Sequence, residues 1–175
     1  MLKAIILLVF LYPLYARKPQ SHEIKQILDS HNRARTGVSP PASNMEEMME
    51  NLAESWYQNT GQNIAITFGH KTENFPFVIS QWHKEVKDYN YNANSCTSGK
   101  MCGHYTQVVW ATSSNVGCAV QRCDKYFTGR IQPTFLYVCQ YKAPGNFIGQ
   151  KPYTTGRSCS NCPKEKKRCK NKLCY

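Results

Sequence analysis

Apolar residues recur at three- and four-residue spacing in three segments of the chain, which predicts three amphipathic helices. The segments are Ser21 to Thr36, Met45 to Tyr57 and Phe77 to Tyr89. We expect Ser21 to cap the first helix, because a serine side chain can accept a hydrogen bond from the first turn. Gly37 lies just past the end of that helix, where a left-handed residue fits. On the apolar face of the same helix, His31 is expected to be a hydrogen-bonded core histidine.

Shorter apolar runs in the second half of the chain predict strands at Val108 to Trp110, Gly117 to Val120 and Phe135 to Tyr141. The segment Thr60 to Asn63 predicts a turn that leads into the short apolar run Ile64 to Ile66. Helices grouped around a few strands that are distant in the sequence predict an α+β fold, with helices packed on a central antiparallel sheet as an α/β/α sandwich.

The N-terminus predicts a secretory signal peptide at residues 1–16. Lys3 supplies a positive charge, Ala4 to Leu11 is an unbroken apolar run, and a basic, polar stretch follows Ala16. The apolar run is too short to span a bilayer, so we expect cleavage after Ala16 and a secreted, extracellular product. A buried N-terminal strand is the alternative. No later run is long enough to predict a membrane span.

Positive charge is concentrated in residues 151–175. The formal net charge of the chain is +11, from 22 basic and 11 acidic residues. In this last segment Glu165 is the only acidic residue among the basic ones, which are Lys151, Arg157, Lys164, Lys166, Lys167, Arg168, Lys170 and Lys172. Such a segment suits an anionic cell surface, a glycosaminoglycan or an acidic protein partner, and secretion argues against nucleic acid. A solvated tail that only aids solubility is the alternative.

The cysteines indicate an oxidising compartment and a disulfide framework. All nine lie between Cys96 and Cys174, and the odd number leaves one thiol without a partner in the chain. The segment from Cys159 to Cys174 is too short to have a hydrophobic core of its own, so its stability depends on cross-links. We therefore predict one domain over residues 17–150, followed by a basic, cysteine-rich hinge at residues 151–175.

Two segments carry a more specific pattern. Gly103 to Trp110 places His104 before an apolar run, and Tyr137 to Phe147 carries a cysteine and ends in a Pro-Gly turn. These segments resemble the two signatures of the CAP superfamily, which includes cysteine-rich secretory proteins, insect venom antigens and plant pathogenesis-related proteins. The Cys-Ser-Asn-Cys-Pro hinge is most similar to the peptidase inhibitor 15 and glioma-pathogenesis-related branches. The resemblance covers nearly the whole mature chain and implies the CAP fold, without an ion-channel-regulatory domain.

The resemblance also implies a cleft with two histidines and two glutamates, of which Glu85 and His104 are present. About twenty residues that relatives place before the Gly-Glu-Asn segment have no counterpart here, so the first histidine is missing and Gln62 replaces the first glutamate. With Tyr105, these residues form the expected binding cleft. A zinc site needs three or four ligands and Gln62 is a poor one, so we expect Glu85 and His104 to pair without metal. Weak zinc binding by His104 and Glu85 is the alternative.

The disulfide pairing is likewise implied by the resemblance. It joins Cys96 to Cys102, Cys118 to Cys139, Cys159 to Cys169, and Cys162 to Cys174. Cys123 is left over, because its expected partner falls in the missing region. A buried free thiol and a dimer linked through Cys123 both remain open.

The sequence favours a secreted binding protein without catalytic residues, because it has no Gly-x-Ser-x-Gly nucleophile segment. The resemblance implies weak inhibition of a serine protease, or a signalling, fertilisation or defence role through an extracellular receptor. The Cys96 to Cys102 loop would present Lys100, which suits a trypsin-like protease. A sterol or lipid carrier and a zinc-dependent hydrolase with a depleted site are alternatives. A further one is a poorly folding variant that lacks activity, because loss of a disulfide costs a few kcal/mol.

Overall fold

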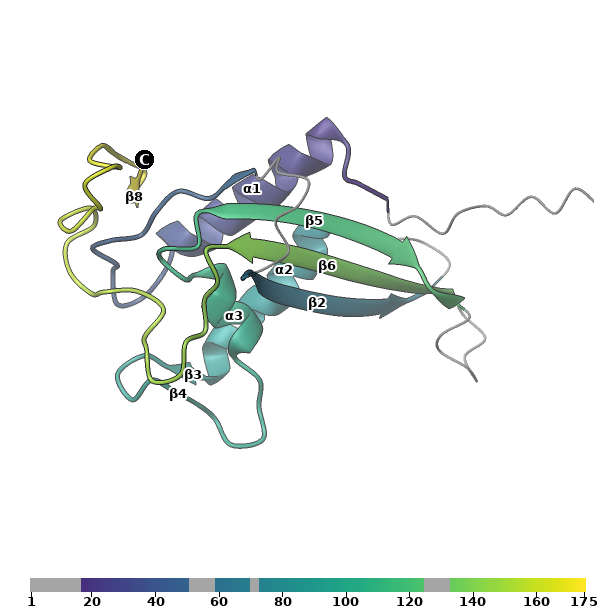
Figure 1. The fold of residues 1–175 in the computed structure, drawn as a ribbon. Coiled ribbons are helices and arrows are strands. Elements are labelled where there is room, and N and C mark those ends of the chain that lie inside the picture. Colours follow the sequence, from purple (N-terminus) through teal and green to yellow (C-terminus); the bar gives the residue numbers. More distant parts are fainter. Residues whose placement is uncertain (1–16, 51–58, 70–72, 125–132) are drawn as a thin grey trace, which may run out of the picture.

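The computed structural model describes residues 17–50, 59–69, 73–124 and 133–175 (Figure 1). The expected signal peptide lies outside these residues. The helices are α1 (Ser21–Thr36), α2 (Phe75–Lys84), the 3-10 helix η1 (Glu85–Asp88) and α3 (Gly103–Val108). The strands are β1 (Met49–Glu50), β2 (Gly61–Phe68), β3 (Tyr89–Asn90), β4 (Ser95–Cys96), β5 (Asn115–Arg122), β6 (Thr134–Lys142), β7 (Cys169–Lys170) and β8 (Leu173–Cys174). No helix in the described part is long and apolar enough to cross a membrane.

The central sheet has the strand order β1-β5-β6-β2. Strand β6 is antiparallel to both β5 and β2, whereas the short β1 runs parallel to β5. The register places Cys118 directly opposite Cys139, and a disulfide joins them across the two strands. The predicted α+β fold with a central, mostly antiparallel sheet is confirmed.

The helices α1, α2 and α3 contact one another, and in Figure 1 α1 and α2 pass behind the sheet while α3 lies beside the start of β2. The sheet face that they cover is closely packed, since Tyr137, Cys139 and Tyr141 of β6 are each 0–1% exposed. Side chains alternate between the two faces of a strand, so the neighbouring positions point away from the helices. On that opposite face the β2 side chains Ile64, Ile66 and Phe68 are 42–43% exposed.

The first helix has the predicted bounds, but both of its ends differ from expectation. Gln20, not Ser21, is the N-cap, and it forms a capping box with Glu23. Gly37 has φ −95°, so it does not adopt the left-handed conformation. The glycine gives a tight end to the helix by donating its backbone N–H to Ala34.

The predicted helix from Met45 to Tyr57 is wrong in its described part. Residues 45–50 are extended and end in β1, and residues 51–57 lie outside the described ranges. Hydrogen bonds from other segments replace those of a helix here. The Asn32 side chain donates to the Met48 carbonyl and accepts from the Met48 N–H, at 3.1 and 2.8 Å. Met45 and Met48 are both buried. Their three-residue spacing therefore reflects burial, which a helix and the observed non-helical segment both provide.

The predicted strand from Val108 to Trp110 is also wrong. Val108 is the last residue of α3, Val109 belongs to a turn, and Trp110 lies in neither a helix nor a strand. All three are at most 5% exposed, so the apolar run reflects burial rather than strand pairing. Elsewhere, Gly61 opens β2 instead of a turn, and Phe75 begins α2 two residues before the predicted start. That helix becomes a 3-10 turn at Glu85, short of the predicted end at Tyr89.

Arg35, at the end of α1, donates five hydrogen bonds to four backbone carbonyl groups. Its Nε and Nη2 donate to Glu46 at 2.9 and 2.7 Å, and Nη2 also donates to Ala111 at 2.8 Å. Nη1 donates to Val108 at 3.1 Å and to Trp110 at 2.8 Å. All five N–H donors of the guanidinium are therefore used, although the side chain is only 1% exposed. Burial lowers the pKa of Arg35 to about 10, so the group stays charged at neutral pH.

His31 is a core histidine, as predicted. It is 0% exposed, its Nδ1 lies 2.8 Å from the Ile27 carbonyl, and its Nε2 lies 2.9 Å from the Tyr141 hydroxyl. Asn63 of β2 donates to the same hydroxyl at 3.3 Å. Burial lowers the pKa of His31 to about 4, so the ring is neutral in the folded protein.

The C-terminal segment is docked on the domain. Leu173 and Cys174 are 3% and 0% exposed, and Cys174 exchanges backbone hydrogen bonds with Met45 and Glu47. The Lys166 ammonium lies 2.8 Å from the Glu46 carboxylate. The four disulfides join the cysteines that the resemblance implies, and two of them lie within this segment. Its stability therefore comes from contacts with residues 41–47 as well as from cross-links.

Replacing Arg35 with Met is expected to lower the free energy of unfolding by about 3 kcal/mol or more, because five carbonyl hydrogen bonds lose their donor inside the protein. Denaturant unfolding measures this change. The matched control is Arg33→Met, on the exposed face of the same helix, which should change stability by under about 0.5 kcal/mol. Equal unfolding midpoints for the two variants would contradict the structural role of Arg35.

Stability is expected to rise with pH between about 4 and 6.5, since the unfolded chain binds a proton at His31 in this range and the folded chain does not. The contribution is on the order of 3 kcal/mol, present in full above pH 6.5 and lost as the pH falls toward 4. Urea unfolding across this range measures it. His31→Gln should flatten the slope, whereas exposed His22→Gln should leave it. An unchanged slope in His31→Gln would overturn the assignment.

Candidate functional site

Glu85 and His104, which the sequence predicts to pair, are in contact. The Glu85 Oε1 lies 2.7 Å from His104 Nδ1, and Oε2 accepts the backbone N–H groups of His104 and Tyr105 at 3.0 and 3.1 Å. The His104 ring stacks on the Trp82 indole, with ring centroids 6.1 Å apart and planes 15° from parallel. Both side chains are partly accessible, at 15% for Glu85 and 27% for His104.

The position of Glu85 explains why these groups meet. The first N–H groups of a helix have no partner within the helix, and Cys102, at the N-cap of α3, supplies no side-chain acceptor. The Glu85 carboxylate, from the 3-10 turn after α2, takes that place by accepting two of them. Glu85 is therefore the cap of α3, and the same carboxylate orients the His104 ring.

The sequence predicts that Tyr105 and Gln62 line a cleft together with Glu85 and His104, but the structure does not place their side chains there. The Tyr105 side chain is 1% exposed and packs against the rings of His83 and Tyr89, with centroids 5.8 Å away in each case. Burial raises its pKa to about 12. Gln62 is exposed and occupies the β2 position whose side chain points away from the helices. Neither side chain has a hydrogen bond to Glu85 or His104 in the described part.

Asn63 is the residue that sequence reasoning missed. It lies on the helix-facing side of β2, is 1% exposed, and donates to the His104 carbonyl at 3.0 Å. It therefore links α3 to the sheet directly below the His104–Glu85 pair. The sequence signal for it is the Gly-Gln-Asn segment, which contains Asn63 next to the predicted site residue Gln62.

The donors at this pair do not fit zinc. Glu85 already accepts three hydrogen bonds and Gln62 points elsewhere, which leaves the free ring nitrogen of His104 as the one ligand atom at this pair without a partner among the described residues. The only group of three metal-binding side chains within the described ranges is Cys159, Cys162 and Cys174, whose sulfurs are in disulfides. A tetrahedral site needs three or four convergent ligands.

Cys123 has no disulfide partner and is 8% exposed. Its Sγ lies 3.7 Å from the Gln121 carbonyl. This low exposure suits the buried-thiol alternative, and the dimer linked through Cys123 stays a prediction.

A second candidate site is the loop closed by the Cys96–Cys102 disulfide. Thr97 is anchored to the Asp88 carbonyl by its N–H at 2.8 Å and its hydroxyl at 3.1 Å. Lys100 donates its N–H back to Thr97 at 2.9 Å, and Gly99 takes φ +73°, which closes a tight turn. Lys100 and Met101 follow this turn and are exposed, Met101 by 68%.

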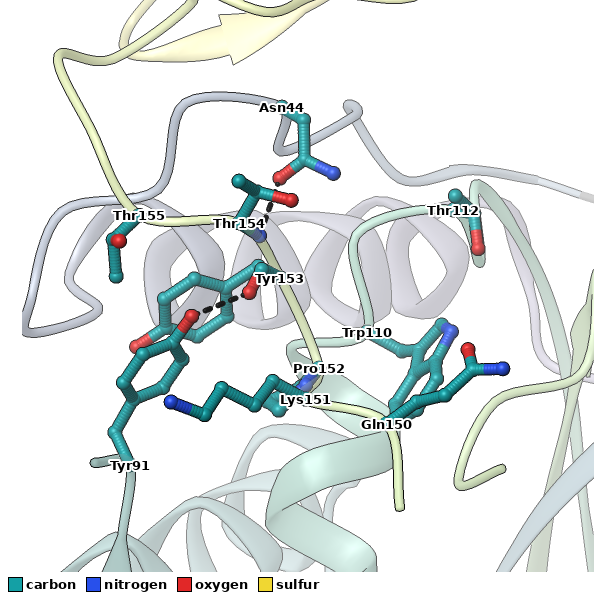
Figure 2. Close-up of a pocket in the computed structure, with 10 residues that line it drawn as sticks. All are labelled: Asn44, Tyr91, Trp110, Thr112, Gln150, Lys151, Pro152, Tyr153, Thr154 and Thr155. Carbon is teal, nitrogen blue, oxygen red and sulfur yellow. Dashed lines mark hydrogen bonds between the residues drawn. The ribbon is translucent and has the colours of Figure 1, made fainter. Parts of the chain in front are cut away.

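A third candidate is an open hollow of about 530 Å³ beside the start of the hinge (Figure 2). Tyr91 stacks on Tyr153 with ring centroids 4.7 Å apart and donates its hydroxyl to the Tyr153 carbonyl at 2.6 Å. Lys151 places its ammonium 4.7 Å from the centre of the Tyr91 ring. Sequence reasoning did not identify this hollow, because its residues come from distant segments.

Comparison with known proteins assigns the family. The sequence model of CAP, the cysteine-rich secretory protein family, matches residues 28–141, which is more than half of the chain. The chain therefore belongs to this family, as the signature segments suggested.

The chain is 40% identical to Peptidase inhibitor 16 of Bos taurus over 171 residues, covering 88% of this chain and 36% of that protein. It is 36% identical to Peptidase inhibitor 15-A of Danio rerio over 183 residues, covering 88% and 70%. The chain spans about a third of the length of the first curated relatives that it matches. The crystal structure of Na-ASP-1 superposes with a TM-score of 0.71 at 23% identity, covering 90% of this chain and 48% of that one, which shows the fold alone.

Replacing Glu85 with Ala is expected to lower the free energy of unfolding by about 2 kcal/mol, because two N–H groups of α3 lose their acceptor. His104→Ala should cost less, since the carboxylate still caps the helix. Denaturant unfolding compares the two, with exposed Glu73→Ala as the control. If His104→Ala proved the more destabilising, the capping role of Glu85 would be refuted.

Proposed function

We propose that this chain is a secreted, non-enzymatic binding protein that weakly inhibits trypsin-like serine proteases through the loop from Cys96 to Cys102. The observation that carries the proposal is the exposed Lys100 in a loop fixed by a disulfide and a turn. Family membership supports it, because two relatives bear the name peptidase inhibitor. The N-terminal apolar run and the four disulfides support secretion.

The loop is suited to binding because it is preorganised. Its disulfide joins two cysteines that are six positions apart in the sequence, and the two hydrogen bonds to the Asp88 carbonyl attach the loop to η1. A loop that is already rigid loses less conformational freedom on binding, so more of the contact energy contributes to affinity. Lys100 is the residue that a trypsin-like specificity pocket, which carries an aspartate, would accept.

The His104–Glu85 pair supports binding rather than catalysis. The Glu85 oxygens are directed at the backbone of α3 and at His104, so the carboxylate itself is not free to act as a general base. The second ring nitrogen of His104 could accept a proton, but a base of this kind needs a nucleophile beside it. No nucleophilic side chain lies in hydrogen-bond contact with His104 within the described residues. The proposal therefore assigns this pair a structural role.

Lys100→Ala is expected to raise the inhibition constant for trypsin at least about tenfold, because the side chain that fills the specificity pocket is removed. Lys100→Arg should stay within about threefold, since trypsin accepts either residue. Titration of trypsin activity with each purified variant measures the constants. Lys87→Ala, an exposed lysine on η1 outside the loop, is the control.

Lys100→Leu sharpens this test, because it should transfer inhibition from trypsin to chymotrypsin, whose pocket is hydrophobic. Unchanged inhibition of trypsin by Lys100→Ala would exclude this loop as the inhibitory element. Absence of inhibition by the unmodified protein would refute the proposed function.

A further inference from the structure

We propose that the hollow of Figure 2 and the basic surface of the hinge together form a binding site for a sulfated glycosaminoglycan chain. The site is separate from the protease-binding loop and does not depend on the proposed inhibition. Three observations carry it: the chemistry of the hollow, the rigidity of the basic residues, and the chain segment that the two share.

The hollow is lined by groups that match a saccharide. Its lining contains hydroxyl, amide and aromatic side chains, one positive charge and no acidic residue: Asn44, Tyr91, Trp110, Thr112, Gln150, Lys151, Pro152, Tyr153, Thr154 and Thr155. Hydroxyl and amide groups can donate to or accept from sugar hydroxyls. The charge of Lys151 has no acidic partner in the hollow, so it is available to a sulfate or carboxylate on the ligand.

The hollow is also preorganised. The Asn44 Oδ1 accepts the N–H of Thr154 at 2.9 Å, which leaves its amide N–H groups for a ligand. Asn94 donates to the Gln150 carbonyl at 3.1 Å and fixes the opposite wall. Figure 2 shows the Lys151 side chain lying across the hollow toward the Tyr91 ring, which holds its ammonium by a cation–π contact.

The basic residues of the hinge are held in fixed positions. Lys166 is paired with Glu46, and the Arg168 guanidinium lies 4.6 Å from the centre of the Tyr175 ring. Lys164, Lys167, Lys170 and Lys172 are exposed, and no ion pair to them occurs in the described residues. The two hinge disulfides and the docked β8 hold the backbone that carries these lysines. A polyanion that binds a rigid set of charges gains from counterion release without ordering a flexible tail.

The hollow and the hinge are built on one segment. Asn44 lines the hollow, while its neighbour Ser43 accepts the N–H of Asn161 in the hinge at 2.9 Å. Two residues further on, Glu46 holds Lys166. The lining residues Thr154 and Thr155 are followed by Gly156 and then by the basic Arg157. A linear chain of several sugars can therefore place one unit in the hollow and continue over the hinge lysines.

The test measures binding of heparin to the full chain at several NaCl concentrations. The triple variant Lys164→Gln, Lys167→Gln, Lys170→Gln should weaken binding about tenfold near 0.15 M NaCl and reduce the slope of log Kd against log[NaCl] by about two. The control triple variant is Lys25→Gln, Lys84→Gln, Lys142→Gln, which removes the same charge from exposed positions on α1, α2 and β6. It should stay within about twofold of the unmodified protein.

A sulfated heparin tetrasaccharide tests the hollow separately, because it is too short to cover the whole surface. Lys151→Gln should weaken its binding about fivefold, whereas Lys25→Gln should not. Near-ultraviolet circular dichroism confirms that each variant keeps the native fold. Equal losses in the two triple variants would overturn the proposal, since attraction would then follow net charge alone. It would also be overturned if Lys151→Gln bound the tetrasaccharide normally, or if the protein bound phosphatidylserine vesicles but not heparin.

Discussion

The guanidinium of Arg35 is the interaction on which the architecture depends. Its five hydrogen bonds reach three separate segments: the extended stretch at Glu46, the end of α3 at Val108, and the turn at Trp110 and Ala111. The Ala111 and Trp110 carbonyls each accept one further backbone N–H, from Glu46 and Ser113, whereas no other donor to the Glu46 and Val108 carbonyls occurs among the described residues. A buried carbonyl without a donor is costly. The charge is stable inside the protein because four carbonyl dipoles point at it, which explains why an arginine occupies a site that is closed to solvent.

The neighbouring positions of α1 extend the same arrangement. Asn32 binds both backbone groups of Met48, and His31 joins the helix to Tyr141 and, through that hydroxyl, to Asn63 of β2. Asn63 in turn binds the carbonyl of His104. One continuous polar network therefore runs from α1 through the sheet to α3. Because the network is fully buried at His31 and Asn63, its geometry fixes the face of the sheet on which α3 rests.

The elements that sequence predicted well are those whose partners are local. The bounds of α1 follow from its own periodicity, and β5 and β6 follow from alternating apolar runs. The stretch from Met45 to Glu50 was mistaken for a helix because its hydrogen bonds come from α1 and the hinge, which no local pattern records. The run at Val108 failed for a related reason, since deep burial of a short apolar run suits a helix end as well as a strand.

The candidate site, like the fold, was predicted from the sequence only in part. The contact between Glu85 and His104 was predictable from family motifs, but the role of Glu85 was not. The sequence shows only that a glutamate is present, and it does not distinguish a carboxylate that caps a helix from one that binds a ligand. The hinge also has a role that its sequence did not show. It was expected to depend on its disulfides, but it is also packed against Met45 and Glu46 of the domain.

The buried polar groups that usually suggest chemistry are thus satisfied internally: Arg35 by carbonyls, His31 by Tyr141, Glu85 by α3. A group that is satisfied within the fold gains nothing from a ligand unless it first loses that partner. Among the described residues, Lys100, Lys151 and several hinge lysines are exposed charged groups that other molecules can reach. The Glu85–His104 pair is accordingly part of the frame of the fold, because its carboxylate caps α3 and orients the His104 ring.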